Sequence, residues 1–233
     1  MELNGIFGGF YKISAWITRF ACLNILWFIF NIPVLFFAYN LLLAGSIGEM
    51  VLTGIILSIL TPFIFFPATT AMFSVMRRWV MGDDMKLVSS YWKYFKEEYR
   101  KSVLGGMFFG TCWLILAIDF YFYGNTDHDG SGIFYAFFIA LSFLLLVFNL
   151  HFFSIIVHAK TNLLQALKNA MMITFGSPIL TLEVGALSFL FIYLSFHGMA
   201  FLLPFGMGAI ISFFAFAAFL RFYSKIQERT AAK

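Results

Sequence analysis

The stretch TPFIFFPATTAMFSVMRRWVMGDD, residues 61–84, begins like a membrane span and ends like the charged terminus of a helix. Its apolar part contains Pro62 and Pro67, and a proline inside a helix removes a backbone hydrogen-bond donor. The stretch then reaches a basic and aromatic group: Arg77, Arg78 and Trp79. We therefore predict a membrane helix that is kinked at the two prolines. The kink either serves helix packing or directs the basic end into a cytoplasmic platform.

The two prolines free the backbone carbonyls of Ser58 and Phe63. In a bilayer, such unpaired carbonyls are tolerated only when neighbouring helices, hydroxyl groups or water donate hydrogen bonds to them. Four hydroxyl side chains are close enough in sequence to do so: Ser58, Thr61, Thr69 and Thr70.

The composition is typical of a polytopic helical membrane protein. Of 233 residues, 62% are hydrophobic and 11% are charged, whereas a soluble domain carries about 25% charged residues. The mean hydropathy is +0.91. The net charge of +4 then indicates orientation in the membrane rather than nucleic-acid binding. Cys22 and Cys112 lie in apolar segments without a CxxC motif, and we expect them to be buried small residues.

Six segments are apolar over about the 20 residues that a bilayer crossing requires. They are residues 20–42, 51–76, 103–123, 133–157, 178–196 and 199–221. All 15 Lys and Arg residues fall in the N-terminal stretch, the second and fourth connections, and the C-terminal tail. The positive-inside rule then predicts six spans with both termini in the cytoplasm. A model with five spans would divide these charges between both faces.

The six spans form one membrane domain, residues 1–233, that divides into three hairpins. Their bounds are 1–79, 80–157 and 158–233. Any protein with six spans divides in this way, but the similar lengths also allow a threefold pseudo-repeat.

The second cytoplasmic connection, MKLVSSYWKYFKEEYRKSV, residues 85–103, predicts an amphipathic helix. Its apolar residues step by three or four positions and share one face: Val88, Trp92, Phe95, Tyr99 and Val103. A basic helix with an aromatic face lies at the membrane surface or docks a cytoplasmic partner. The predicted partner-binding set is Arg77, Arg78, Trp79, Trp92, Phe95 and Tyr99. Residues 161–178 predict a second short helix, which Asn162 caps and Gly176 ends.

Polar residues inside the spans require a reason, because burying them in lipid is costly. Glu183 either reaches the cytoplasmic interface or pairs with His151, which lies at a similar depth. Asn24 and Asn31 are seven residues apart on the first span, and we expect both to form interhelical hydrogen bonds.

The sequence contains no HExxH, GxSxG, Walker A or GxGxxG motif. His151 and His158 share a face but lack the tighter spacing and further ligands of a zinc site. The outer loop YGNTDHDGSG, residues 123–132, could hold a cation through Asp127, His128 and Asp129, although we expect a solvated turn. We therefore predict neither an enzyme nor a bound metal or cofactor.

Four stretches of the chain are similar to sequences of a known family: PATTAMFSVMRRWVMGDD, LNILWFIFNIP, YWKYFKEEYRKS and NLLQALKNA. Together they resemble the YesL-like family of bacterial integral membrane proteins, over most of the chain. That family has no established biochemical function. Its genes often lie beside carbohydrate ABC importers and polysaccharide-degrading enzymes, which implies an accessory role in sugar uptake. Pro33 and Pro67 are farther apart here than in many members, which suggests a longer subtype.

These observations favour a non-enzymatic, multi-pass accessory protein of the bacterial cell membrane, with the lipid bilayer and ABC importer subunits as partners. The alternative is a small-solute or proton-coupled transporter that uses the intramembrane polar residues. The importer's own permease is disfavoured, because residues 161–178 lack the Glu-Ala-Ala sequence that docks an ATPase.

Overall fold

The structure is a computed structural model that describes residues 6–124, 131–159 and 161–231. All regular secondary structure in these ranges is helical, which confirms the predicted all-α class. The helices are α1 (Ile6–Phe30), α2 (Ile32–Leu43), α3 (Ile47–Leu60), the π-helical turn η1 (Thr61–Phe65), α4 (Phe66–Val80), α5 (Leu87–Glu97), α6 (Tyr99–Gly124), α7 (Ser131–His158), α8 (Leu163–Gly176), α9 (Pro178–Phe196), α10 (Leu202–Phe205) and α11 (Met207–Ala231).

Six helical segments in the described ranges are long and apolar enough to cross a membrane, which agrees with the predicted number. They are Tyr11–Phe30, Ile47–Val80, Tyr99–Tyr123, Gly132–His158, Pro178–Phe196 and Met207–Glu228. The chain thus has the character of a multi-pass membrane protein. Length and composition do not orient these segments, so the cytoplasmic position of the termini stays a prediction.

The first span differs from its predicted bounds, because the helix breaks inside residues 20–42. Asn31 leaves the helical conformation with φ −94° and ψ 5°. Pro33 follows in the first turn of α2, where its missing N–H costs no helical hydrogen bond. The candidate span therefore ends at Phe30, and α2 continues as a separate short helix.

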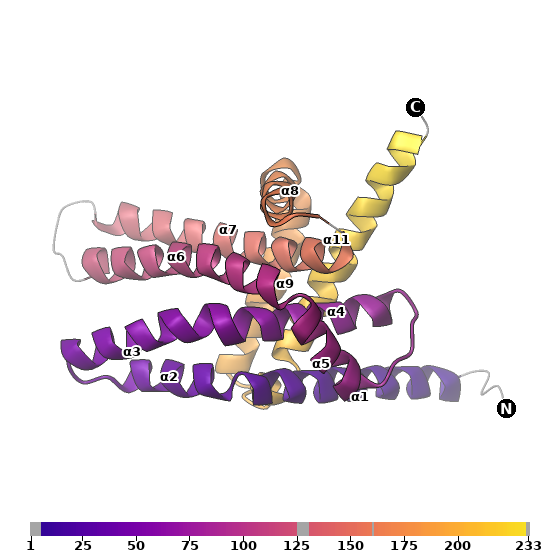
Figure 1. Cartoon of the computed structure of the whole chain (residues 1–233), viewed down its shortest axis with the longest axis horizontal. Helices are drawn as coiled ribbons and strands as arrows, with labels where there is room; N and C mark the ends of the chain where they lie inside the picture. Colours follow the sequence, from indigo (N-terminus) through magenta and orange to yellow (C-terminus); the bar gives the residue numbers. More distant parts are fainter. Residues whose placement is uncertain (1–5, 125–130, 160, 232–233) are drawn as a thin grey trace.

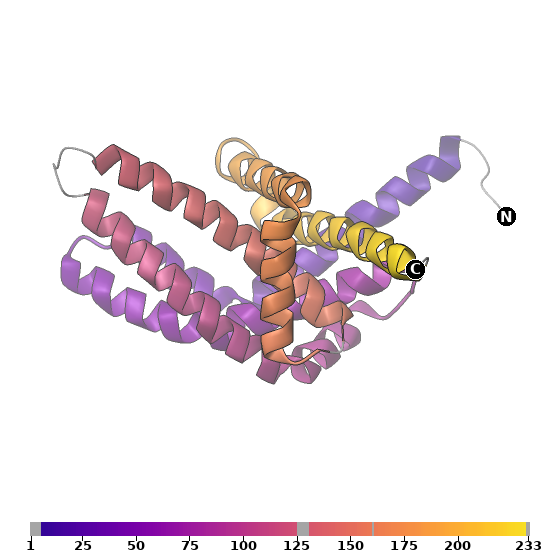
Figure 2. The ribbon, with the colours of Figure 1, turned by 90° about the horizontal axis from the view of Figure 1, so that it is seen from above.

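The helices form an elongated bundle in which two directions dominate. Figure 1 shows α1 to α4, α6 and α7 lying along the long axis, while α9 and α11 cross it steeply. Figure 2 shows α8 (orange) running across α7 rather than along it, and these two helices are in contact. The helices α9 and α11 are oriented differently from α6 and α7, and the arrangement in three hairpins stays a prediction. The threefold pseudo-repeat stays a prediction.

Helix α4 is the centre of the bundle. It contacts α1, α5, α6, α7 and α11. Twelve of its residues are buried: Phe66, Pro67, Ala68, Thr69, Thr70, Ala71, Met72, Phe73, Ser74, Val75, Met76 and Trp79. A helix that is buried on all sides belongs to the interior of a protein. The stretch with the two prolines therefore supplies the core helix around which the others pack.

The predicted kink at Pro62 and Pro67 is a π-helical turn within one long helix. Residues Thr61–Phe65 form η1, and the N–H of Phe66 bonds to the carbonyl of Thr61. Single π-turns of this kind accommodate an irregularity without ending the helix. The segment Ile47–Val80 consequently remains a single candidate span.

Ser58 and Thr70, two of the four hydroxyl residues near the prolines, bond to carbonyls other than the predicted ones. Ser58 donates to the carbonyl of Gly54 at 2.8 Å, and Thr70 donates to that of Phe66 at 3.0 Å. Their role is thus to bond their own helix four residues back, and they do not bridge the carbonyls that Pro62 and Pro67 free.

Helix α6 lies directly against the π-turn, at a glycine. A Cβ atom added to Gly106 would lie 2.8 Å from the Cα atom of Pro62 and 2.8 Å from the side chain of Phe66. Only a residue without a side chain allows the backbones of α6 and η1 to approach this closely, as small residues do in membrane helix packing.

Candidate functional site

The basic end of α4 is closed by a glycine-containing helix stop. Gly82 has φ +89°, in the left-handed region that favours glycine. Its N–H bonds to the carbonyl of Trp79, and the N–H of Asp83 bonds to that of Arg78 at 2.9 Å. This pair of bonds is the Schellman motif of helix C-termini. It explains why MGDD follows the long helix, and it places two carboxylates beside basic side chains.

Those carboxylates hold the end of α4 in place. Asp83 forms an ion pair with Arg78 at 2.8 Å, within the same turn. Asp84 pairs with Arg19 of α1, and so connects the first helix to the end of the fourth. The guanidinium of Arg19 also lies 5.6 Å from the ring of Trp79, in a cation–π arrangement.

The prediction that Trp79 faces a partner is wrong. Its side chain is only 6% exposed, because it packs against α1 and belongs to the core around α4. Arg78 is exposed but already paired. Arg77 is partly buried, and its Nε has no hydrogen-bond partner in the described part of the chain.

The buried face of α5 is shifted by one residue from the predicted face, because Tyr91 is buried and Trp92 is not. Tyr91 is fully buried, and its hydroxyl donates a hydrogen bond of 2.8 Å to the carbonyl of Ala68 on α4. Burial raises the pKa of Tyr91 well above its usual value of 10.0, so the hydroxyl keeps its proton at physiological pH. By contrast, Val88 and Trp92 are 68% and 49% exposed.

The exposed aromatic group of α5 remains ordered by stacking. The rings of Trp92 and Phe95 are stacked at 5.6 Å, and Phe30 of α1 contacts both. The ammonium of Lys96 lies 5.3 Å from the ring of Trp92. Tyr99 contacts Phe95 at 5.6 Å, so three of the predicted partner-binding residues do lie together.

The amphipathic helix does not continue to Val103 as predicted. Helix α5 ends at Glu97, Glu98 has φ −98° and ψ 8°, and α6 begins at Tyr99. Val103 is buried in α6 instead. Residue 98 is thus a corner between a surface helix and a span.

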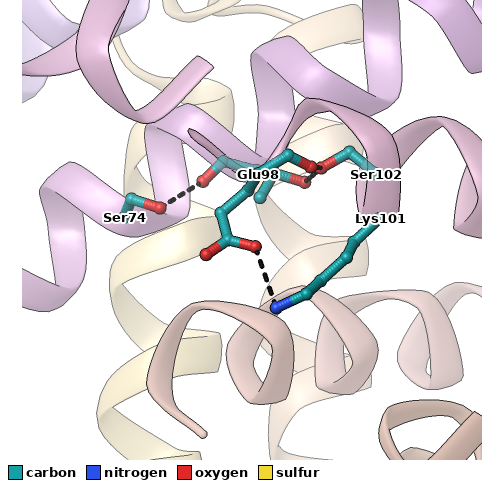
Figure 3. A network of polar contacts seen from close by, with 5 residues as sticks. Ser74, Glu98, Lys101 and Ser102 are labelled. Carbon is teal, nitrogen blue, oxygen red and sulfur yellow. Dashed lines mark hydrogen bonds and ion pairs between the residues drawn. The ribbon is translucent and has the colours of Figure 1, made fainter. Parts of the chain in front are cut away.

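A chain of polar contacts connects this corner to α4 (Figure 3). The Oγ of Ser102 lies 2.9 Å from Oγ1 of Thr70 and 2.7 Å from the carbonyl oxygen of Glu98. Ser74 donates to the carbonyl of Thr70 at 3.0 Å, and Lys101 lies 3.4 Å from Glu98. These contacts satisfy buried hydroxyl groups and fix the start of α6 against the core helix.

Removing the hydroxyl of the buried tyrosine is expected to loosen α5 from α4. The Tyr91→Phe variant leaves the carbonyl of Ala68 without this donor, which costs about 1–2 kcal/mol of unfolding free energy. The measurement is unfolding in mixed detergent micelles, with Tyr39→Phe as the control because Tyr39 is 62% exposed on α2. Equal stability of Tyr91→Phe and the wild type would contradict this role.

Among the intramembrane polar residues, Asn24 makes the expected interhelical hydrogen bonds and Asn31 does not. The amide of Asn24 donates to the carbonyl of Leu203 at 2.8 Å and accepts from the N–H of Ala209 at 3.0 Å. Asn31 donates to the carbonyl of Trp27 in its own helix, at the break between α1 and α2. The same carbonyl also accepts from the backbone N–H of Asn31, at 3.1 Å.

The suggested pair of Glu183 and His151 is wrong, because Glu183 forms an ion pair with Arg221 of α11. His151 is fully buried, and neither ring nitrogen has a hydrogen-bond partner in the described part of the chain. The ring of His158 packs against three aromatic residues of α11: Phe216, Phe219 and Tyr223.

Two further predictions concern the cysteines and the ends of α8. Cys22 is exposed on the outer face of α1 and Cys112 is partly exposed, so the expectation that both are buried is wrong. Asn162 occupies the N-cap position of α8 without a side-chain hydrogen bond, while α8 ends at Gly176 as expected.

In the described ranges, no group of three or more His, Cys, Asp or Glu residues could hold a metal ion. The outer-loop residues Asp127, His128 and Asp129 lie outside those ranges.

Comparison with known proteins supports the family resemblance. A family described as "Protein of unknown function, DUF624" matches residues 20–120. The chain is 27% identical to "Uncharacterized protein YesL" of Bacillus subtilis (strain 168) over 238 residues, covering 100% of both chains. It is 32% identical over 120 residues to "Uncharacterized protein YteU" of the same organism, covering 51% of this chain and 43% of that protein. No solved structure matches the chain.

The alignment with YesL extends over the whole of both chains, and the expectation of a longer subtype stays a prediction. Together, the family match over residues 20–120, the full-length similarity to YesL and the helical architecture show that the chain is similar to the YesL-like family of proteins of unknown function.

Proposed function

We propose that the chain is a non-enzymatic accessory protein of the bacterial cell membrane, and that it binds a subunit of a carbohydrate ABC importer through α5. The supporting observation is the surface of that helix. Val88 and Trp92 are 68% and 49% exposed, and α5 is not one of the segments that are long and apolar enough to cross a membrane. Exposed large apolar side chains on such a helix can mark an interaction site. The link to carbohydrate uptake rests on the family resemblance.

The chemistry of this surface suits a protein partner. Trp92 is an aromatic anchor that its stack with Phe95 already holds in one orientation, so little side-chain entropy is lost on binding. Lys96, whose ammonium lies 5.3 Å from the Trp92 ring, brings positive charge to its border, while Lys93 is paired with Glu97. An acidic rim around an apolar pocket is the expected complement on the importer subunit.

The proposal is tested by affinity purification from the native host in mild detergent, with quantitative mass spectrometry of importer subunits. Trp92→Ala is expected to reduce their recovery about tenfold or more, as for an interface hot spot. Tyr39→Ala is the matched control, because Tyr39 is also an exposed aromatic residue and lies on α2, away from α5. Unchanged recovery with Trp92→Ala, or equal loss in both variants, would contradict the proposal.

A transporter is the second candidate, and the buried histidine favours it. His151 lies in the interior of α7 with both ring nitrogens unbonded in the described residues, and the Oδ1 atom of Asn149 is unbonded as well. Such groups in a membrane interior often mark a path for protons or solutes. Uptake of a panel of small sugars into proteoliposomes under a pH gradient tests this. Flux that His151→Phe abolishes would favour transport, and the absence of any flux would exclude it for that panel.

A further inference from the structure

A groove of about 460 Å³ lies where α9 begins beside the last turns of α11. Ser177, Pro178 and Ile179 form one side, and Ala218, Phe222 and Lys225 form the other. Its position follows from the two candidate spans, because Pro178–Phe196 starts here and Met207–Glu228 ends here. The groove therefore lies at one membrane interface, at the end of this helix pair away from the α10 turn.

Positive charge exceeds negative charge in the groove. Arg221 and Lys225 are four residues apart, so they share one face of α11, and both line it. Glu183 is the acidic residue that lines the groove. Its carboxylate forms an ion pair with the guanidinium of Arg221 and uses some of its N–H donors. Arg221 remains 68% exposed and has five N–H donors. No ion pair to Lys225 is present in the described part of the chain.

The start of α9 adds hydrogen-bond donors to this charge. Ser177 holds the N-cap position without a side-chain hydrogen bond. The first backbone bond into the helix is from the N–H of Thr181 to the carbonyl of Ser177, at 3.0 Å. The N–H groups of Ile179 and Leu180, which line the groove, therefore have no intrahelical acceptor. The positive end of the helix dipole favours an anion at this place.

The walls of the groove are apolar, which suits an amphiphile better than a soluble ion. Ile179 is 82% exposed, and Phe222 and Ala218 face the same space. An acyl chain can cover these side chains, while a soluble phosphate compound leaves them exposed. Basic pockets between membrane helices bind anionic lipid headgroups for this reason.

We propose that this groove binds the phosphate group of an anionic phospholipid. Arg221, Lys225 and the first turn of α9 hold the phosphate, and the side chain of Ile179 borders the acyl chain. Glu183 competes with the phosphate for Arg221 and so weakens binding.

The test uses the purified full chain in neutral detergent, with thermal stability followed during titration with phosphatidylglycerol or phosphatidylcholine. Phosphatidylglycerol is expected to stabilise the wild type more than phosphatidylcholine does. Lys225→Gln is expected to weaken the apparent affinity for phosphatidylglycerol about fivefold. Glu183→Gln is expected to strengthen it, because Arg221 becomes free. Lys168→Gln is the control, since Lys168 lies on α8 and does not line the groove.

Two outcomes would overturn the proposal. One is a phosphatidylglycerol affinity that Lys225→Gln leaves unchanged, or that Lys168→Gln lowers equally, since the lipid would then bind elsewhere or by net charge. The other concerns the source of the phosphate, and is checked with glycerol 3-phosphate and inorganic phosphate. If either of these stabilises the protein at the same concentration as phosphatidylglycerol, the ligand is a soluble phosphate and not a lipid.

Discussion

The Gly106→Val variant is expected to lose about 3 kcal/mol of unfolding free energy, at the upper end of the range for overpacked cores. The reason is the contact between α6 and the π-turn. An added Cβ atom would meet the Cα atom of Pro62 at 2.8 Å. Because the contact is with backbone, rotation of a side chain cannot relieve it, and the two helices must move apart.

Gly110→Val is the matched control for this prediction. Gly110 lies one turn farther along α6, and a Cβ atom added there has no neighbour within 4 Å. Both substitutions change helix propensity equally, so the difference between them reports the contact alone. Unfolding in mixed detergent micelles measures it. Equal stability of the two variants would mean that α6 does not pack against the prolines as described.

The Asn24→Leu variant is expected to lose about 1–2 kcal/mol, the range observed for interhelical hydrogen bonds in membranes. The side chain is fully buried and bonds to two backbone groups near the start of α11, Leu203 and Ala209. Leucine has the same branched shape but is larger, so the loss arises from the unpaired N–H and carbonyl groups together with tighter packing.

The control for Asn24 is Asn40→Leu on α2. Asn40 is partly exposed, and its amide donates to the carbonyl of Phe36 in its own helix. The same micelle assay should show little change. A loss at position 40 as large as that at position 24 would indicate that the amide of Asn24 does not connect α1 to the last hairpin.

The sequence allowed prediction of the features that depend on many residues together. Six spans follow from long apolar segments, and the all-helical class follows from them. Asn24 could be predicted as an interhelical contact, because an amide in a membrane span must find a partner. The special role of residues 61–84 was also visible, since two prolines in an apolar helix require unusual packing.

Features that depend on a choice between similar neighbours could not be predicted. On α5, the residues Leu87, Tyr91 and Tyr94 form a second face with helical spacing, beside the one that contains Trp92. That face leads to the charged Glu98, whose Oε2 atom is buried and lies 3.4 Å from the ammonium of Lys101.

Side-chain contacts between helices that are distant in the sequence could not be predicted either. Glu183 and His151 lie at similar predicted depths, but depth does not determine which sides of two helices face each other. Arg221 is 38 residues from Glu183, and it pairs with it because α11 and α9 are antiparallel neighbours. Trp79 is buried for the same kind of reason, since α1 covers it and Arg19 lies beside its ring.

The most direct test of the account is side-specific cysteine labelling in a chain where Cys22 and Cys112 are replaced by serine. We predict that α5 lies on the cytoplasmic side and that the turn before α3 lies outside, while α4 is buried in the core of the bundle. A membrane-impermeant maleimide should therefore label Gly45→Cys in intact cells, but Ser89→Cys only after the cells are permeabilised. Ser74→Cys should stay unlabelled until denaturation, because position 74 is 7% exposed. Labelling of Ser89→Cys in intact cells, or of Ser74→Cys in the folded protein, would contradict the account.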